Sequence, residues 1–425
     1  MYAPPLWLVI LWSLFVLQAW LSAAQARKFL RSFRESRHTN SLYTPKVTVI
    51  VPFKGVDHEM ESGIRRLCEQ NYPTYSLRMV VQSEDDAAYP ILLRELARYP
   101  QRQARVLVAG EASPTEGQKV HNQLFALRDI YDNTPDQDVW VFADSDAIPG
   151  PEWLRHLVGP LAQSKKTGLT TGYRWLIPSP ASSGQIAESP AIDGSKPTIW
   201  SHLASLMNGS VAMMLGRDEW NHAWGGSMAI RADIARQGRL RDRLAGALCD
   251  DYQFTRLSRD LGLRVYFVPQ CLVATPVSFD CRGMFNFGHR QYLLTRVYAP
   301  RVFLTGLLLT SLYVAGFTSL VAYLLWCVAH GWTKMPWIWP VVALVLAAAG
   351  DQFRALFRRR AVRLAFGEKT VQQLRPTLRL DQWATPWWML MHWMTIVRSA
   401  FGRTMRWRGI LYRLDGPQRC ERLTL

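Results

Sequence analysis

Closely spaced cysteine pairs are missing from this chain. Its 425 residues include 6 cysteines, and none of them forms a Cys-x-x-Cys pair or follows a metal-ligand spacing. They stand at positions 68, 249, 271, 281, 327 and 420. Zinc sites need such spacing, and disulfides need an oxidising compartment. We therefore expect no zinc site, no disulfide and a globular part that faces a reducing cytosol.

Acidic residues are also scarce, and no internal repeat or low-complexity segment occurs. The chain carries 33 acidic against 50 basic side chains, a net charge of +17. Such a surplus can indicate nucleic-acid binding. Much of it lies beside the apolar segments, however, where basic residues attract anionic lipid head groups. We expect this charge to face the lipid bilayer, with no nucleic acid as partner.

No charged residue occurs before Arg27. Residues 5–24 are long and apolar enough to cross a bilayer, so segment 1–26 is expected to be an N-terminal transmembrane helix. A signal peptide cleaved after Ala-Ala-Gln-Ala is the alternative, but its apolar part is too long and no basic residue precedes it. The residues that follow are basic: Arg27, Lys28, Arg31, Arg34 and Arg37. This asymmetry predicts an integral membrane protein with a cytoplasmic catalytic domain, in a bacterial inner membrane or the Golgi or ER.

Two later blocks, about 302–328 and 337–350, also lack charge and predict a transmembrane hairpin over about 302–350. A basic cluster follows the second block, at Arg354, Arg358, Arg359, Arg360 and Arg363. Segment 382–401 contains His392 and Arg398, which favours an interfacial position over a further span. We therefore expect a soluble domain over 27–285. The C-terminal membrane region, 286–425, would hold an interfacial helix, the hairpin, the interfacial segment and a basic tail.

The middle of the chain alternates short β-branched runs with helical stretches. Predicted strands cover 46–52, 78–82, 104–108, 140–143 and 264–268, and predicted helices cover 59–70 and 252–261. This alternation is typical of an α/β fold with a Rossmann-type, mostly parallel sheet. Parallel strands present their carboxyl ends at one edge, so the acidic residues that follow them should meet in one crevice.

The run Val139-Trp-Val-Phe-Ala-Asp-Ser-Asp146 is the most informative part of this pattern. An apolar strand that ends in two carboxylates suits a divalent cation holding phosphate oxygens. The alternative is an acidic turn that leads into Pro149 and Pro151. We expect Asp144 and Asp146 to hold Mg²⁺ or Mn²⁺.

Five motifs occur in an order that resembles the family 2 type of nucleotide-sugar glycosyltransferases, with a GT-A fold. They are Val49-Ile-Val-Pro-Phe-Lys-Gly55, Gln82-Ser-Glu-Asp-Asp86, Gly117-Gln-Lys-Val-His-Asn122, Asp144-Ser-Asp146 and Asp250-Asp-Tyr252. The likeness is greatest to ceramide glucosyltransferases and extends to the ending Trp407-Arg-Gly-Ile-Leu-Tyr-Arg413. It implies a UDP-sugar donor, a membrane lipid acceptor and an inverting, metal-dependent transfer of a hexose, with glucose favoured.

The resemblance also assigns expected roles to single residues. Asp251 matches the general base, with Asp250 in place of the family's Glu, although a helix N-cap is an alternative for this pair. Asp85 or Asp86, with Asp85 slightly favoured, would contact the uridine or ribose. Further donor-binding positions are Lys119 and Asn122 of the Lys-x-x-Asn motif, Asp144, and Gly226 of the Trp224-Gly-Gly-Ser loop. His202 fits a structural role better than a catalytic one.

One motif departs from the family. A Gln/Arg-x-x-Arg-Trp sequence is expected before the membrane hairpin, and here Gln291 is present but Leu294-Thr295 replaces Arg-Trp. Arg296, or else Arg290, is the expected substitute for binding the diphosphate, because either lies within a turn or two of the missing position. Two alternatives therefore stay open: transfer to another acceptor such as a hopanoid or polyprenyl phosphate, and a membrane-anchored nucleotide-sugar binder without catalysis.

Overall fold

A seven-stranded mixed sheet forms the centre of the soluble domain. The computed structural model describes residues 4–35, 43–57, 59–134, 136–180, 196–216, 220–331 and 336–423. The strand order is β3-β2-β1-β4-β6-β5-β7. The strands are β1 Val47–Pro52, β2 Tyr75–Val81, β3 Gln103–Val108, β4 Val139–Ala143, β5 Thr167–Pro178, β6 Ser227–Arg231 and β7 Arg264–Val277. Within the described part of the chain β6 alone runs against the others, so the expected mostly parallel α/β sheet is confirmed.

Helices cover both faces of this sheet. The described helices of the soluble domain are α2 Met60–Cys68, α3 Ala88–Leu96, α4 Gln118–Asn133, α5 Trp153–Val158, the 3₁₀ turn η2 Gly159–Ala162, α6 Ile199–Ala212, α7 Ala232–Gln237, α8 Leu240–Leu244 and α9 Asp250–Asp260. In β1, Val49 and Val51 pack against α2, α3 and α5, whereas Ile50 packs on the opposite side with α4 and α9. The strands are apolar on both faces because both faces are covered.

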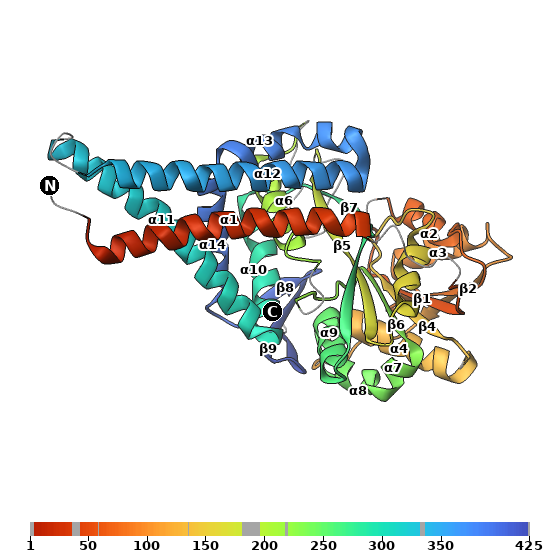
Figure 1. Ribbon diagram of the computed structural model, residues 1–425. Coiled ribbons are helices and arrows are strands. Elements are labelled where there is room, and N and C mark those ends of the chain that lie inside the picture. Colours follow the sequence, from red (N-terminus) through yellow and green to blue (C-terminus); the bar gives the residue numbers. More distant parts are fainter. Residues whose placement is uncertain are drawn as a thin grey trace.

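Three long helices are apolar enough to cross a membrane. They are α1 Leu6–Glu35, α11 Pro300–Ala329 and α12 Ile338–Gln373, and they agree with the three apolar segments expected from the sequence. α1 and α12 lie side by side and run in the same direction (Figure 1). Both helices begin at the end that is far from the sheet, and both end beside the sheet. Near the sheet, Phe29 of α1 and Val362 of α12 pack in one cluster with Phe267 of β7. These long helices are thus continuous with the wall of the domain that holds the large sheet.

The C-terminal helices connect this bundle to the soluble domain. They are α10 Cys281–Tyr298, α13 Arg375–Trp383 and α14 Thr385–Ser399. α14 has 15 residues, a length of roughly 22 Å at the usual helical rise, which is too short for the hydrocarbon core. It packs against α10 and α11. This length is compatible with the interfacial position expected for 382–401. Arg37, one of the basic residues counted after the first span, lies outside the described residues.

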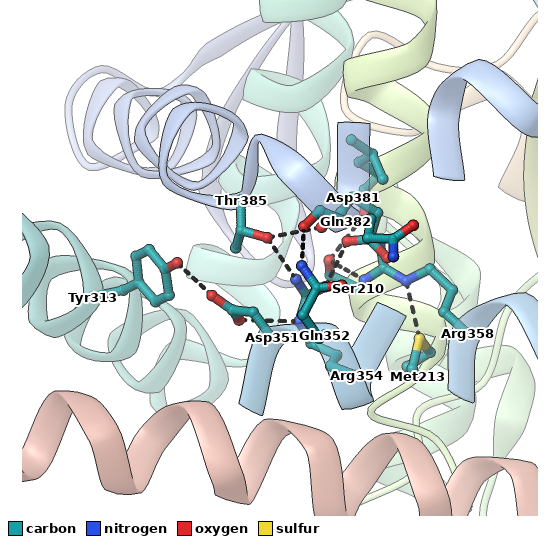
Figure 2. A network of polar contacts seen from close by, with 11 residues as sticks. Ser210, Met213, Tyr313, Asp351, Gln352, Arg354, Arg358, Asp381, Gln382 and Thr385 are labelled. Carbon is teal, nitrogen blue, oxygen red and sulfur yellow. Dashed lines mark hydrogen bonds and ion pairs between the residues drawn. The ribbon is translucent and has the colours of Figure 1, made fainter. Parts of the chain in front are cut away.

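A buried polar network fastens α12 to its neighbours (Figure 2). Asp381 of α13 accepts from Arg354 at 2.7 Å and lies 3.1 Å from Arg358. Arg358 also donates to Ser210 of α6 at 3.0 Å. These charged side chains are nearly inaccessible to solvent, so each needs a partner. The network therefore fixes the position of α12 relative to helix α6.

The expected basic tail is folded. Residues 404–423 form a three-stranded antiparallel sheet of β8 Thr404–Trp407, β9 Ile410–Gly416 and β10 Arg419–Leu423. Its apolar side, with Met405 and Leu414, packs against Leu248 and against Leu293 of α10. Sequence pattern did not predict this sheet, because its strands are short and rich in arginine. The turn between β8 and β9 reaches the carboxyl edge of the large sheet.

Candidate active site

A cavity lies at the carboxyl ends of β1 and β4. Its walls come from the start of α4, the loop before β6, the start of α9, the middle of α10 and the β8–β9 turn. This is the place where open α/β sheets bind ligands. It brings together Lys119, Asn122, Asp144, Asp146, Asp251 and Gln291 of the residues predicted from the sequence.

Lys119 forms ion pairs with two carboxylates of the cavity, one after β4 and one at the start of α9. Its Nζ lies 2.8 Å from Oδ1 of Asp144 and 3.1 Å from Oδ1 of Asp250. Burial favours the neutral form of Asp144, but the Lys119 ammonium outweighs it and lowers the pKa of this carboxyl. Gln123 donates to the other oxygen of Asp250 at 2.6 Å. Lys119 therefore neutralises carboxylates in this state, whereas the sequence suggested contact with phosphate.

Asp146 differs from its neighbour because no described side chain is in direct contact with its carboxylate. Among the described residues it makes no hydrogen bond or ion pair. Burial and the negative charges of Asp144 and Asp57 raise its pKa to about 6. A carboxylate in this position is stabilised by a cation, and Asp144 and Asp146 offer the hard oxygen donors that Mg²⁺ and Mn²⁺ prefer. The donor set thus fits the divalent ion expected from the sequence.

Asp251 occupies the first turn of α9 and lines the cavity. Its Oδ1 accepts from the Cys249 thiol at 2.8 Å and from the backbone of Tyr252 at 2.7 Å. Burial and the adjacent Asp250 raise its pKa to about 6. These two donors leave Oδ2 free to accept a proton, so Asp251 has the position and the basicity of a general base.

Cys249, Asp250 and Asp251 together also lie close enough to hold a metal ion. Burial raises the pKa of the Cys249 thiol well above its usual range, so the sulfur is protonated. Both oxygens of Asp250 are occupied by Lys119 and Gln123. A protonated thiol and an ion-paired carboxylate are poor metal ligands. These groups therefore suit Asp251 as a general base better than as a metal ligand.

Glycines before β6 make room for these charged groups. A Cβ on Gly225 would lie 2.7 Å from both Asp250 Oδ2 and Lys119 Nζ. A Cβ on Gly226 would lie 2.7 Å from Asp144 Oδ2 and closer still to the Trp224 ring. The sequence predicted that this loop approaches the donor sugar; in the structure it approaches the Lys119 pairs. Gly225 lines the cavity, whereas Gly226 is not among its lining residues.

Several predicted residues make structural contacts or do not line the cavity. Asp85 is exposed, and Asp86 accepts from the backbone of Gly55 and Ala88 at 2.9 Å each. Neither lines the cavity, although Asp86 fixes the turn that carries Lys54 into it. Asn122 donates to the Val80 carbonyl at 3.3 Å, which ties α4 to β2. His202 bonds Thr377 of α13 at 2.8 Å, the structural role expected for it.

The two candidates for the missing arginine are separated by the structure. Arg296 points away and bonds the Gly402 carbonyl, whereas Arg290 lines the cavity 5.4 Å from the centre of the Trp407 ring. Leu294 is buried among the residues that hold the small sheet. The side chain of Thr295 bonds the Tyr252 hydroxyl at 2.7 Å. Positions 294 and 295 therefore serve packing here.

Sequence reasoning missed several cations of the cavity. Lys54, Arg174 and Arg408 all line it. Lys54 and Arg408 belong to motifs already singled out, but no role was given to them. No sequence pattern pointed to Arg174, because β5 mixes polar and apolar residues and was not predicted as a strand. Among the lining side chains, five are basic and four are acidic: Lys54, Lys119, Arg174, Arg290 and Arg408, against Asp144, Asp146, Asp250 and Asp251.

Comparison with protein families gives a match over nearly the whole chain. The profile of the family described as Glycosyl transferase family 21 matches residues 6–419. A ceramide glucosyltransferase of Komagataella phaffii is 32% identical over 68 residues, which is 16% of this chain and 13% of that protein. The chain thus aligns with only a small part of that relative's length.

Solved structures were also found to be similar. A mannosyltransferase from Pyrobaculum calidifontis, in complex with GDP-Man and Mn²⁺, is 15% identical and covers 88% of this chain and 99% of its own, with a TM-score of 0.48. Glucosyl-3-phosphoglycerate synthase from Mycobacterium tuberculosis, with Mn²⁺, UDP and glucosyl-3-phosphoglycerate, is 15% identical. It covers 54% of this chain and 71% of its own, with a TM-score of 0.33.

Proposed function

The chain belongs to glycosyl transferase family 21, and from this membership we propose that it transfers a hexose from a UDP-sugar to a hydroxyl of a membrane lipid such as ceramide. Glucose is the favoured sugar, and the transfer inverts the anomeric centre. One observation carries the proposal: an unpaired carboxylate, Asp146, and a basic carboxylate, Asp251, line the same cavity. This is the pairing that a metal-assisted displacement at a sugar carbon needs.

A divalent ion, Mg²⁺ or Mn²⁺, would be held by Asp146 with Asp144 beside it. When bound, it supplies positive charge that stabilises the leaving diphosphate. Asp144 keeps its own charge compensated by Lys119 at 2.8 Å. Lys119 and Gln123 in turn hold Asp250, so that the start of α9 stays in place beside the cavity.

Asp251 takes the proton from the acceptor hydroxyl as its oxygen attacks the anomeric carbon. The acceptor must then approach from the face opposite the diphosphate, which is what inversion requires. Hydrogen bonds from Cys249 and Tyr252 orient the carboxylate. The neighbouring negative charge of Asp250 raises its basicity into a useful range.

The position of the cavity supports a lipid acceptor. Arg290, Gln291 and Leu294 line it from α10, and α10 leads through Ala299 directly into the membrane helix α11. A hydroxyl at the bilayer surface is therefore the acceptor that this wall favours. The basic residues at the sheet-proximal end of α1, Arg27 and Lys28 among them, support a cytoplasmic catalytic domain.

The proposal is tested by release of UDP from detergent-purified protein. UDP-glucose, UDP-galactose and UDP-GlcNAc are each supplied with Mn²⁺ or Mg²⁺, and with ceramide, a hopanoid, polyprenyl phosphate or no lipid. Release that depends on both metal and ceramide supports the proposal. Release that depends on another lipid would identify that lipid as the acceptor in place of ceramide. UDP binding without any release would mean that the protein binds the nucleotide sugar but does not catalyse transfer.

A further inference from the structure

The turn between β8 and β9 carries an arginine in an unfavourable backbone conformation. Trp407 pairs with Ile410, so Arg408 and Gly409 alone form the connection. Their φ angles are 50° and 79°. Such two-residue turns have positive φ at both positions and favour Asn-Gly. A side chain as large as arginine is strained there, and strain of this kind is found where the side chain has a task.

The Arg408 side chain points into the cavity. Its Nη1 donates to the Lys54 carbonyl at 2.9 Å and lies 2.9 Å from Oδ1 of Asp57. Its Nη2 donates to Oδ2 of Asp57 at 3.0 Å. These contacts leave Nε–H and one hydrogen of Nη2 unused. The guanidinium is thus oriented on one side by a bidentate pair and keeps donors for a ligand.

Asp57 links this arginine to the acidic motif. The Ser145 hydroxyl, between Asp144 and Asp146, donates to Asp57 at 2.5 Å. Burial disfavours the charge of Arg408, but Asp57, Asp146 and Asp144 outweigh it and raise its pKa, so the guanidinium stays charged. The arginine therefore faces the place where a divalent ion and a diphosphate would lie together.

The small sheet that carries this turn is anchored to the rest of the protein through its β9–β10 turn and β10. Gln253 of α9 donates to the Pro417 carbonyl at 3.0 Å, and Gln418 donates to the Asp242 carbonyl at 2.7 Å. The backbone of Arg422 donates to the Pro114 carbonyl at 2.7 Å. A sheet anchored at these points gives the β8–β9 turn a fixed base from which to place a charge.

The cavity is lined by a tryptophan and an arginine from the small C-terminal sheet. The expected Arg-Trp of α10 is replaced by Leu294-Thr295, whereas Trp407 and Arg408 line the same cavity as Gln291 and Leu294. Arg290 lies over the Trp407 ring, at 5.4 Å from its centre. A Trp-Arg pair is thus present in the cavity, but it comes from the small C-terminal sheet.

We propose that Arg408 binds the diphosphate of the nucleotide-sugar donor and does the work of the arginine that α10 lacks. The inference rests on the proposed donor and adds a residue to it. Nε and Nη2 donate to a phosphate oxygen, and the fork geometry distinguishes arginine from lysine in this role. Asp57 is the residue that positions it.

Binding of three probes in the presence of Mn²⁺ tests this inference: UDP, inorganic pyrophosphate and uridine. Arg408→Asn suits the turn and removes the charge. We expect it to weaken UDP and pyrophosphate about tenfold to a hundredfold, as loss of charge-assisted hydrogen bonds does, and to leave uridine unchanged. Arg408→Lys should recover part of the loss. Arg406→Asn is the matched control, because Arg406 is exposed on β8 and does not line the cavity.

The outcomes separate this inference from the proposed function. Unchanged UDP and pyrophosphate binding in Arg408→Asn overturns the inference, and so does an equal loss for all three probes, which would mean a structural role. If wild-type protein binds pyrophosphate but not UDP, the proposed UDP-sugar donor is wrong. The role of Arg408 in binding a diphosphate is then still tested by the pyrophosphate affinities of wild type and variant. Wild-type protein that binds neither refutes both.

Discussion

Lys119 places its ammonium nitrogen 2.8 Å from Oδ1 of Asp144 and so occupies one of the two carboxylates expected to hold the metal. Asp146 remains the carboxylate without a partner among the described residues. The two acidic residues of one motif thus have different surroundings. Asp146 is the primary candidate for the metal, and Asp144 is tied to α4 and α9 through Lys119.

This difference predicts an unequal loss of metal binding. Asp146→Asn removes the uncompensated charge and should abolish Mn²⁺ binding at the site. Lys119→Met removes a competing cation, so Mn²⁺ should bind more tightly to the protein without donor. Titration of Mn²⁺ followed by electron paramagnetic resonance measures both. Weaker binding in Lys119→Met would contradict this assignment.

Activity should depend on the protonation of Asp251. Burial and Asp250 raise its pKa to about 6, so the base is protonated below that pH and free above it. Turnover at saturating metal and donor should therefore rise between about pH 5 and pH 7. The thiol hydrogen bond from Cys249 lowers this pKa. Cys249→Ala should then shift the acid limb to higher pH, whereas Cys249→Ser should leave it nearly in place; identical profiles would refute the role of the thiol.

A methyl group at Gly225 should separate Lys119 from Asp250. The added Cβ would lie 2.7 Å from atoms of both side chains, which is closer than real contacts allow. We expect Gly225→Ala to lower kcat by about tenfold or more, since a small misplacement at a catalytic centre is costly. Gly150→Ala is the control, because nothing lies within 4 Å of its Cβ. Equal activity of both variants would show that the pair is dispensable.

The polar network at α12 should be essential for stability. Asp381→Asn removes the carboxylate that Arg354 and Arg358 share and leaves Arg354 only its longer pair with Asp351, and breaking a buried pair costs about 3–5 kcal/mol. A fall in melting temperature in detergent measures this loss. Glu368→Gln breaks the exposed pair with Arg363 and should change stability by less than about 1 kcal/mol. Similar melting temperatures for the two variants would contradict the burial argument.

The sequence predicted the parallel strands and the acidic edge because both follow from local pattern. Val139–Ala143 is a fully buried apolar run, and its carboxylates follow where a parallel strand must end. β5 and β6 were not predicted as strands, because their pairing is set by contacts far apart in the chain. Register of this kind is not visible in the periodicity of one segment.

The acidic residues that line the site were all named from the sequence, whereas its basic residues were named only in part, as Lys119 and Arg290. Carboxylates at strand ends form short motifs, as in Asp144-Ser-Asp146. Arg174 and Arg408 enter the cavity from a strand edge and from a C-terminal turn, and only the fold brings them there. Lys119 was assigned to phosphate from its motif. Its ion pair with Asp250 could not be seen in the sequence, because the two residues are more than 100 positions apart. Such pairs depend on tertiary structure alone.

The most direct test compares wild-type protein with Asp251→Asn in two assays: Mn²⁺-dependent UDP release with UDP-glucose and ceramide, and the affinity for UDP. The account predicts that the variant binds UDP as the wild type does but loses lipid-dependent release almost completely. Release at the wild-type rate from Asp251→Asn would contradict the assigned base and the mechanism built on it.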